Sequence, residues 1–596
     1  MRTLQLALLT SSLLLTSTLA AAQPALNEIF DQTYEEWLQR SPVEMSRQGN
    51  SARNFEWDDL GPEEPKLRVE ILRRGAEKAR QAAAGQRLNK ETALSLKLFL
   101  DRAELEERGL EFAEYDYPVN QMYGWHAEVP AFMANAHSVG NSSDAVNYLR
   151  RLEALPGFFA QLVEGLKRRE KKGILPPAFV FDYVLSDIDN LLSGFPLTET
   201  PDRVHPIYAD FSTKVKALRL SPAEQDELLR RAQAALKNRF RPAYQDLRKT
   251  LQEQRSRATQ DDGVWKFPQG DRFYAYQLAT ITTTSLTAQE IHDLGLSEVE
   301  RIHGEMRAIM KKVGYEGSLQ EFFEFLRNDP RFVYSNDQAG RAAYLQEATA
   351  IVDRMRLQLN KLFLTQPKAP LVVKAVESYR EKSAGKAFYE SPALDGSRPG
   401  IYYANLYDMP SMPKYQMEAL AYHEAIPGHH MQLSIAQELQ GIPKFRRLGG
   451  YTAYIEGWGL YCEQLPKEYG FYQDPYSDFG RLSMELFRAA RLVVDTGIHH
   501  KRWTRAQALK YYTSNTPNSA RDCQKMVDRH IVMPGQATAY KIGMIEILRL
   551  RAKAQKAMGA RFDIRRFHDV VLLHGAVPLK VLEELVDDYI RTVTKL

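Results

Sequence analysis

Apolar residues recur at three- and four-residue spacing, with charged residues between them, through most of the chain up to residue 265. Such spacing places the apolar side chains on one face of an amphipathic helix. The pattern predicts helices over residues 63–86, 91–113, 144–172, 178–193, 206–219 and 222–256. The last of these helices begins with Ser221-Pro222-Ala223-Glu224, a capping box with proline at the first helical position. We therefore expect a mainly α fold.

The composition changes around residues 263–286, where aromatic residues and threonine become frequent. Beyond this change, helical patterns return over residues 287–312, 318–327 and 341–364, and short strands are predicted at residues 371–373 and 400–405. We place a boundary here between a helical scaffold domain, residues 23–265, and a second domain, residues 266–596. The two domains are also compatible with one body, in which helices surround a deep cleft and a small β element lies next to a metal-binding helix.

The first 22 residues have the pattern of a secretory signal peptide. Arg2 precedes an apolar run over residues 4–19, and three alanines follow at residues 20–22. We expect cleavage after Ala20 or Ala22 and a mature protein that is periplasmic or secreted. No later stretch is apolar enough to span a bilayer, so stable membrane insertion is not expected. No cysteine lies at the cleavage point, which argues against a lipid anchor.

Charge and cysteine content narrow the functional classes further. The net charge of +4 is small for 596 residues, and Lys and Arg are spread along the helical patterns. Nucleic acid is therefore not an expected partner. The two cysteines, Cys462 and Cys523, lack metal-ligand spacing, and an oxidising compartment would allow either a disulfide or a pair of free thiols.

One stretch carries the residues of a metal site. Glu424 directly follows His423, His429 and His430 lie six and seven residues after His423, and Glu456 lies 26 residues beyond His430. Two neutral imidazoles and one carboxylate make a zinc site with an open fourth position. A glutamate directly after the first histidine is where a metallopeptidase has its general base. The stretch predicts one zinc ion per chain.

The histidine spacing differs from that of His-Glu-x-x-His, in which the two rings lie one helical turn apart. On an ideal helix His429 would lie about 240° round from His423, and His430 would lie about 10.5 Å along the axis. Pro427 and Gly428 interrupt the helix, because proline lacks an amide donor and clashes with the carbonyl of His423. If the interruption takes two residues out of the helical register, His429 occupies the position one turn after His423 and is the second ligand. If it takes out three residues, His430 occupies that position. We favour His429.

The motif His-Glu-x-x-Pro-Gly-His-His followed by Glu-Gly-Trp, here residues 423–430 and 456–458, is similar to the signature of the bacterial family called domain of unknown function 885. The resemblance extends over most of the mature chain and is strongest from residue 270 onward. That family is grouped with the gluzincin metallopeptidases, mostly helical zinc enzymes such as oligopeptidases and angiotensin-converting enzyme. The resemblance implies that residues 266–596 form a catalytic, zinc peptidase-like domain.

The same resemblance implies roles for residues outside this stretch. Gluzincins have an edge strand before the zinc helix that pairs with an extended substrate, and residues 400–405 occupy the corresponding place. A tyrosine more than a hundred residues after the zinc helix donates a hydrogen bond to the oxyanion, and Tyr540 matches it. On the predicted helix 476–500, Arg488 and Arg491 are expected either to bind a peptide carboxylate or to brace the metal ligands. The residues assigned to substrate binding are Asn405, His430, Arg488, Arg491, His499 and Lys541.

Together these residues predict a zinc-dependent metallopeptidase. His423, His429 and Glu456 would hold zinc, Glu424 would act as general base, and Tyr540 would stabilise the oxyanion. The expected substrate is a peptide, and both carboxypeptidase and oligopeptidase action fit. Two alternatives are a zinc hydrolase of non-peptide amides or esters and a catalytically inactive peptide-binding protein on the same scaffold. The sequence predicts no particular oligomeric state.

Overall fold

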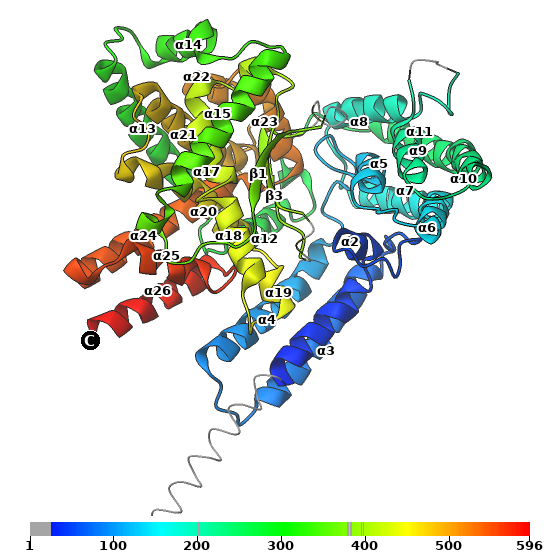
Figure 1. The fold of residues 1–596 in the computed structure, drawn as a ribbon, viewed down its shortest axis with the longest axis horizontal. Helices are drawn as coiled ribbons and strands as arrows, with labels where there is room; N and C mark the ends of the chain where they lie inside the picture. The colour runs from blue at the N-terminus through cyan, green and yellow to red at the C-terminus, as the bar shows by residue number, and fades with distance from the viewer. Residues whose placement is uncertain are drawn as a thin grey trace, which may run out of the picture. The chain divides into compact units, whose positions relative to one another are not determined.

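The computed structural model describes residues 25–595, apart from 200–202, 378–380, 382, 383, 395 and 397 (Figure 1). The predicted signal peptide, residues 1–22, lies outside the described residues. The described chain forms two compact units, one ending at Asp262 and including residues 266–268, the other made of residues 263–265 and the chain from Gln269 onward. Both units are built from helices, so the predicted mainly α fold is confirmed. No helix in the described part has the length and the apolar run that crossing a membrane requires.

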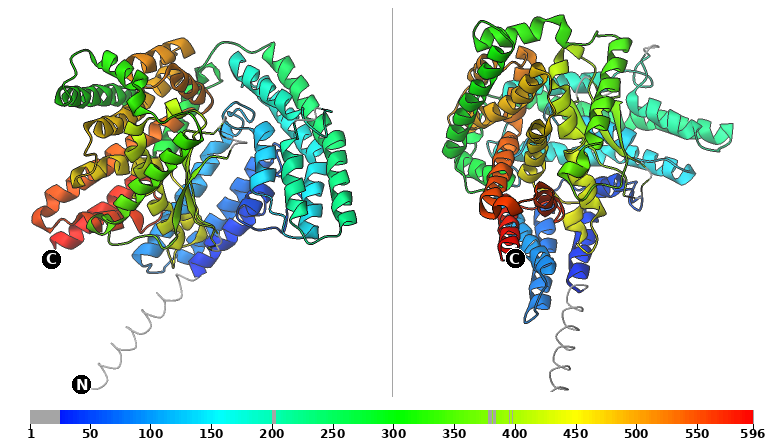
Figure 2. Two further views of the ribbon diagram at one scale, coloured as in Figure 1. Left: turned by 45° about the horizontal axis from the view of Figure 1, so that its top comes forward. Right: turned by 60° about the vertical axis from the view of Figure 1, so that its left-hand side comes forward.

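The first unit consists of helices joined by loops of varied length. Residues 25–38 are helical. The helices that follow are α2 (Pro42–Arg47), α3 (Glu64–Ala83), α4 (Lys90–Gly109), α5 (Trp125–Asn135), α6 (Ser142–Glu153), α7 (Leu155–Lys171), α8 (Ala178–Leu191), α9 (Pro206–Lys216), α10 (Pro222–Ala235) and α11 (Arg241–Arg255). Helices α3 and α4 lie side by side, as Figures 1 and 2 show.

Prolines account for two differences between this unit and the sequence patterns. The single helix predicted over residues 144–172 is two helices, because α7 begins with Pro156 in its first turn, and proline has no amide hydrogen with which to continue α6. No pattern predicted α5, which contains Pro130. Proline normally breaks a helix, so a helix over these residues is not expected from local rules. The capping box at Ser221 is present as predicted.

The second unit contains the remaining elements. They are α12 (Gly270–Thr282), α13 (Ala288–Lys312), α14 (Leu319–Asn328), α15 (Gln338–Arg356), α16 (Leu359–Leu362), β1 (Leu371–Ala375), β2 (Ala387–Glu390), β3 (Gly400–Ala404), α17 (Met417–Glu424), α18 (His429–Glu438), α19 (Lys444–Arg447), α20 (Thr452–Gln464), α21 (Pro475–His499), α22 (Arg505–Asn515), α23 (Ala520–Val532), α24 (Ala539–Met558), α25 (Ile564–Leu572) and α26 (Leu579–Thr594).

The β element is a three-stranded sheet in the order β1-β3-β2 that packs against α15, α17 and α18. Strand β1 runs parallel to β3, with Leu371 opposite Gly400, and β2 runs antiparallel to β3, with Ala387 opposite Ala404. Sequence patterns predicted β1 and β3 but not β2. Because β3 is hydrogen bonded on both sides, it has no free edge. The prediction that residues 400–405 form an edge strand for substrate is therefore wrong.

Helix α21 is buried along nearly its whole length. Every residue from Phe479 to His499 is buried, and α21 packs against α13, α17, α22, α23 and α24 (Figure 1). Its charged side chains therefore face protein rather than solvent. A charge removed from water is costly unless it is paired and hydrogen bonded. The partners of these side chains therefore show which of the buried charges are stabilised within the fold.

The two cysteines, Cys462 on α20 and Cys523 on α23, are buried free thiols, which decides between the two states that the sequence left open. Burial raises the pKa of Cys462 well above its usual value and that of Cys523 to about 12. Both are therefore protonated at neutral pH and pack as small apolar side chains.

Candidate metal centre

The helical segment that carries the candidate metal ligands is interrupted between His423 and His429. Helix α17 ends at Glu424 and α18 begins at His429, with a cis peptide bond between Ile426 and Pro427. The carbonyl oxygen of Pro427 accepts hydrogen bonds from two side chains of α20, Trp458 Nε1 at 3.0 Å and Cys462 Sγ at 3.3 Å. A Cβ on Gly428 would lie 2.0 Å from the carbonyl oxygen of His423, so the interruption requires glycine there.

The interruption brings His429 back beside His423. Nε2 of each histidine lies 3.6 Å from Oε2 of Glu456, and the two ring centroids are 4.6 Å apart. The three ligand atoms lie within 4.8 Å of one another. Tetrahedral zinc with bonds of about 2.0–2.1 Å separates its ligand atoms by about 3.3 Å. The donor set and its spacing therefore fit one zinc ion with a fourth position left for water or substrate.

A second glutamate supports the first histidine. Oε1 of Glu463 lies 2.8 Å from Nδ1 of His423 and 3.3 Å from Nη2 of Arg488. A carboxylate on the distal nitrogen of a metal-binding histidine fixes the tautomer that presents the other nitrogen. Sequence reasoning missed Glu463. The available signal was its position two helical turns after Glu456 on an otherwise apolar helix.

The pKa values of Glu424 and Glu456 are shifted in opposite directions. Burial raises the pKa of Glu424 above the ordinary value of a glutamate, against the opposing charges of His423 and His429. Burial also acts on Glu456, but its contacts with the two imidazoles outweigh burial and hold its pKa well below the usual value. Glu456 is therefore a carboxylate ready to bind a cation, while Glu424 has the greater affinity for a proton.

His430 faces away from this cluster. Its Nδ1 accepts a hydrogen bond from the Tyr389 hydroxyl at 3.0 Å, and its Nε2 donates to the carbonyl of Ala369 at 3.1 Å. Burial lowers its pKa to about 4. Both ring nitrogens of His430 are engaged, and they join α18 to the sheet. His430 lies neither among the candidate metal ligands nor at the surface.

Two other residues assigned to substrate binding are also engaged within the fold. Nδ2 of Asn405 donates to the carbonyls of residues 381, 384 and 385 at 2.7–3.1 Å, which shapes the loop before β2. Nζ of Lys541 lies 2.6 Å from Glu485 and 2.9 Å from Glu298, and its side chain is 1% exposed. Both side chains stabilise the second unit through these contacts.

His499 has a similar structural role. Its Nδ1 accepts a hydrogen bond from the Val264 amide at 3.2 Å, and its Nε2 donates to the carbonyl of His530 at 2.9 Å. It is fully buried. His499 therefore connects the end of α21 to α23 and to the start of the second unit.

Tyr540 lies on a helix that packs closely against the ligand helix α20. A Cβ on Gly457 would lie 2.5 Å from Cα of Gly543, so α20 and α24 touch directly beside Glu456, one turn along α24 from Tyr540. The Arg491 guanidinium lies 4.6 Å from the centroid of the Tyr540 ring, and Arg529 Nη2 lies 3.5 Å from its hydroxyl. No sequence signal had indicated Arg529.

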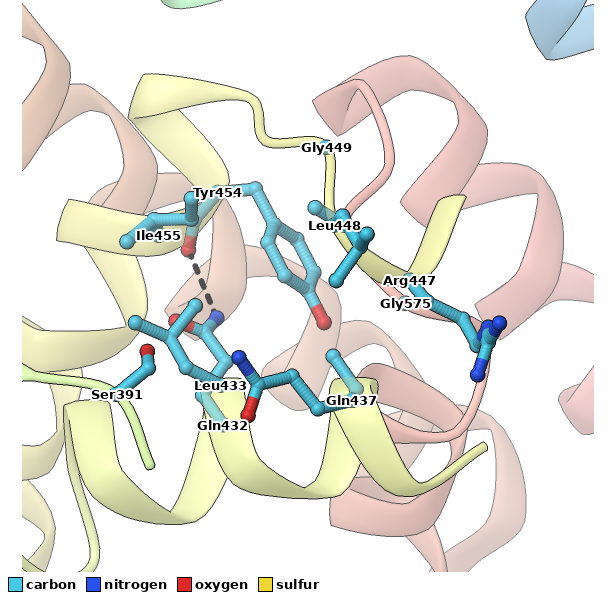
Figure 3. Close-up of a pocket in the computed structure, with 12 residues that line it drawn as sticks. Ser391, Gln432, Leu433, Gln437, Arg447, Leu448, Gly449, Tyr454, Ile455 and Gly575 are labelled. Atoms are coloured by element: carbon cyan, nitrogen blue, oxygen red, sulfur yellow. Dashed lines mark hydrogen bonds between the residues drawn. The ribbon is translucent and has the colours of Figure 1, made fainter. Parts of the chain in front are cut away.

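A small cavity of about 110 Å³ lies between α18, α20 and the segment after α19. Figure 3 shows Gln432 and Gln437 of α18 facing Tyr454 of α20, and Gln432 Nε2 donates to the Tyr454 carbonyl at 3.3 Å. None of the three candidate metal ligands lines this cavity. The cavity is therefore separate from the metal centre.

The family described as "Bacterial protein of unknown function (DUF885)" matches residues 42–586 of this chain. A crystal structure of a "putative lipoprotein" from Colwellia psychrerythraea is 31% identical, with a TM-score of 0.89, over 96% of this chain and 99% of that one. A "putative lipoprotein of unknown function" from Shewanella oneidensis is 18% identical, with a TM-score of 0.72, over 94% and 99% of the two chains, and shows the fold alone. Among curated proteins, none matches.

Proposed function

This chain belongs to the DUF885 family of bacterial proteins, and we propose that it is a zinc-dependent peptidase of the gluzincin type. One observation carries the proposal: the Nε2 atoms of His423 and His429 each lie 3.6 Å from a carboxylate oxygen of Glu456, with Glu424 directly after the first histidine. That donor set, with a carboxylate general base beside it, is the one that zinc hydrolases use.

His423, His429 and Glu456 would hold the metal, and Glu463 would hold the ring of His423 from behind. When bound, zinc supplies a Lewis acid that polarises the substrate carbonyl and lowers the pKa of water. Burial of the cluster strengthens these electrostatic effects, because His423 is 3% exposed and Glu424 is 7% exposed.

Glu424 moves the proton in this proposal. Its carboxylate takes a proton from the attacking water and gives it to the leaving amine. Burial raises the pKa of Glu424 above that of an ordinary glutamate, which makes it a better proton acceptor. The Tyr540 hydroxyl then donates a hydrogen bond to the oxyanion that develops on the substrate carbonyl.

We further propose that the mature chain works outside the cytoplasm, in the periplasm or as a secreted protein. The apolar leader over residues 4–19 supports this location. The description of the Colwellia and Shewanella proteins as lipoproteins agrees with an envelope location for relatives. Both cysteines of this chain are buried in the second unit, so neither is available there for a lipid.

The test is metal content and peptide hydrolysis of the chain from residue 23 onward. We expect about one zinc per chain, lost in His423→Ala, His429→Ala and Glu456→Ala and retained in the matched control His430→Ala. Glu424→Gln should keep zinc and lose about 10²–10⁴-fold in turnover. Full activity in Glu424→Gln, or no uptake of added zinc by the parent, would refute the proposal. A parallel panel of simple amides and esters identifies a hydrolase of non-peptide substrates.

A further inference from the structure

The charged residues buried on α21 each have an ion-pair or hydrogen-bond partner, with one exception. Arg481 pairs with Asp478 and Glu485, and Arg488 pairs with Glu463. Glu485 also pairs with Lys541. Asp495, further along the helix, accepts hydrogen bonds from the Tyr274 hydroxyl at 2.6 Å and the Gly535 amide at 2.9 Å. Arg491 is the remaining charge.

Arg491 has no acidic partner among the residues that the structure describes. It is 6% exposed, and its Nε and Nη1 atoms are buried without a hydrogen-bond partner. Its neighbours are the rings of Phe487 and Tyr540, with centroids 5.4 and 4.6 Å from the guanidinium carbon. A buried guanidinium with unused donors is costly, so its presence here points to an anion that arrives from outside the chain.

Further positive charge surrounds the same place. Arg488 and Arg529 both act on Arg491 as like charges, and Nε of each also lacks a partner among the described residues. Arg529 is half-buried and reaches Tyr540 and Gln536 through Nη2. Two carboxylates, Glu463 and Glu424, face this group of three arginines, both through Arg488. The excess of cations over carboxylates favours a ligand with at least one negative charge.

The cationic group lies next to the candidate metal centre. Arg488 contacts Glu463, which contacts the ligand His423, and the charge of Arg488 also reaches Glu424. Arg491 lies one helical turn beyond Arg488 on the same helix face, where side chains are about 5–6 Å apart. An anion held by Arg491 is therefore a few residues of extended chain from a peptide bond at the metal, since an extended residue spans about 3.3–3.6 Å.

We propose that Arg491, assisted by Arg529, binds the C-terminal carboxylate of a peptide substrate, so that the cleaved bond lies close to the C-terminus. A planar guanidinium with free donors matches a carboxylate in a two-point hydrogen-bonded pair. The inference rests on the proposed peptidase function, which supplies the substrate class. It implies that the protein is an exopeptidase. Arg488 has a different role, because its partner Glu463 holds a metal ligand.

A competing role for Arg491 is to stabilise the oxyanion together with Tyr540, whose ring it covers. The two roles differ in what they require of the substrate. An oxyanion contact affects every substrate equally, whereas a carboxylate contact affects only peptides with a free C-terminus. The comparison of one peptide with its C-terminal amide therefore separates the two roles.

The experiment measures binding of N-acetyl-tetraalanine and its C-terminal carboxamide by calorimetry, using the zinc-loaded chain in a Glu424→Gln background. Arg491→Met removes the charge and keeps much of the side-chain volume, and no ion pair is lost, so folding is expected. Arg529→Met is the second variant, and Arg307→Met, an exposed position on α13, is the matched control. Thermal unfolding of each variant checks the fold.

We expect the free acid to bind about 10- to 100-fold more tightly than the amide, and Arg491→Met to abolish most of that difference while binding of the amide changes by less than about twofold. In the parent enzyme, mass spectrometry should detect release of alanine or dialanine from the C-terminus. Equal binding of acid and amide by the parent, or an equal loss of both in Arg491→Met, would overturn the inference. A parent that binds the acid selectively but hydrolyses nothing would refute the peptidase function alone.

Discussion

Gly459 has no side chain and so leaves room for the imidazole ring of His423, a candidate metal ligand. A Cβ at this position would lie 2.7 Å from Cε1, 2.9 Å from Nε2 and 3.0 Å from Nδ1 of His423. Favourable contacts between such atoms begin at about 3.5 Å, so Gly459→Ala must displace the imidazole by about 0.5–1 Å. The ring has little freedom to move, because Glu463 and Glu456 contact its two nitrogens.

That displacement exceeds the tolerance of a metal site. Zinc–nitrogen distances hold within about 0.2 Å, and altered support of a ligand costs about 10–100-fold in metal affinity. We therefore expect the zinc dissociation constant of Gly459→Ala to rise by that factor, equivalent to about 1.4–2.7 kcal/mol. The metal-free stability should change less, because alanine gains about 1 kcal/mol over glycine inside a helix and offsets part of the clash.

The assay is competition for zinc against a chromogenic chelator, with thermal unfolding measured with and without zinc. Gly304→Ala on α13 is the control, because a Cβ there meets nothing within 4 Å. It should gain about 0.5–1 kcal/mol in stability and leave zinc affinity unchanged. Parent-like zinc affinity in Gly459→Ala would show that His423 is not a ligand or that its ring is free to move.

Two further predictions test the surroundings of the centre. Glu463→Gln should weaken zinc about 10- to 100-fold in the same chelator assay, and unchanged affinity would show that the contact with His423 carries no orienting role. Burial raises the pKa of Asp495 to about 7, above the unfolded value of about 3.9, so the folded protein binds more protons between these values. The free energy of unfolding should therefore fall by up to about 1.4 kcal/mol per pH unit as pH rises through this range. Asp495→Asn should flatten this slope in urea titrations, and an unchanged slope would contradict the assignment.

Local patterns predicted most of the helices, although not α2 or α5, and located the candidate ligands. The ligands lie in one segment, residues 423–456, and the Pro427-Gly428 pair indicated the interruption on which their register depends. The same reasoning failed for β3, because whether a strand lies at an edge depends on partners far along the chain. Strand β2 is only four residues long and lies in a segment that reads as a loop.

The charged residues of α21 show a second limit. Arg488, Arg491 and Asp495 follow a spacing that is usual for a solvated helix face, yet all three are buried. The spacing of charged residues along a helix cannot show whether their partners are water molecules or protein groups, because both stabilise a charge. Only the spatial neighbours reveal that Arg488 has a carboxylate and that Arg491 has none. Arg529 lacked a signal for the same reason.

The placement of the ligands and their support in residues 423–463 has a consequence for folding. The candidate ligands and Glu463 lie on α17, α18 and α20, whereas the contacts of Arg491 with Tyr540 and of Tyr540 with Arg529 join α21, α23 and α24. Parts of a structure open locally with different free energies, often as separate cooperative units. Helix α23 carries Arg529 and supplies none of the candidate ligands, so its local opening is expected to disturb the part proposed to select the substrate and to leave the ligands in place. Weakening α23 should therefore reduce selectivity for the C-terminus before it releases the metal.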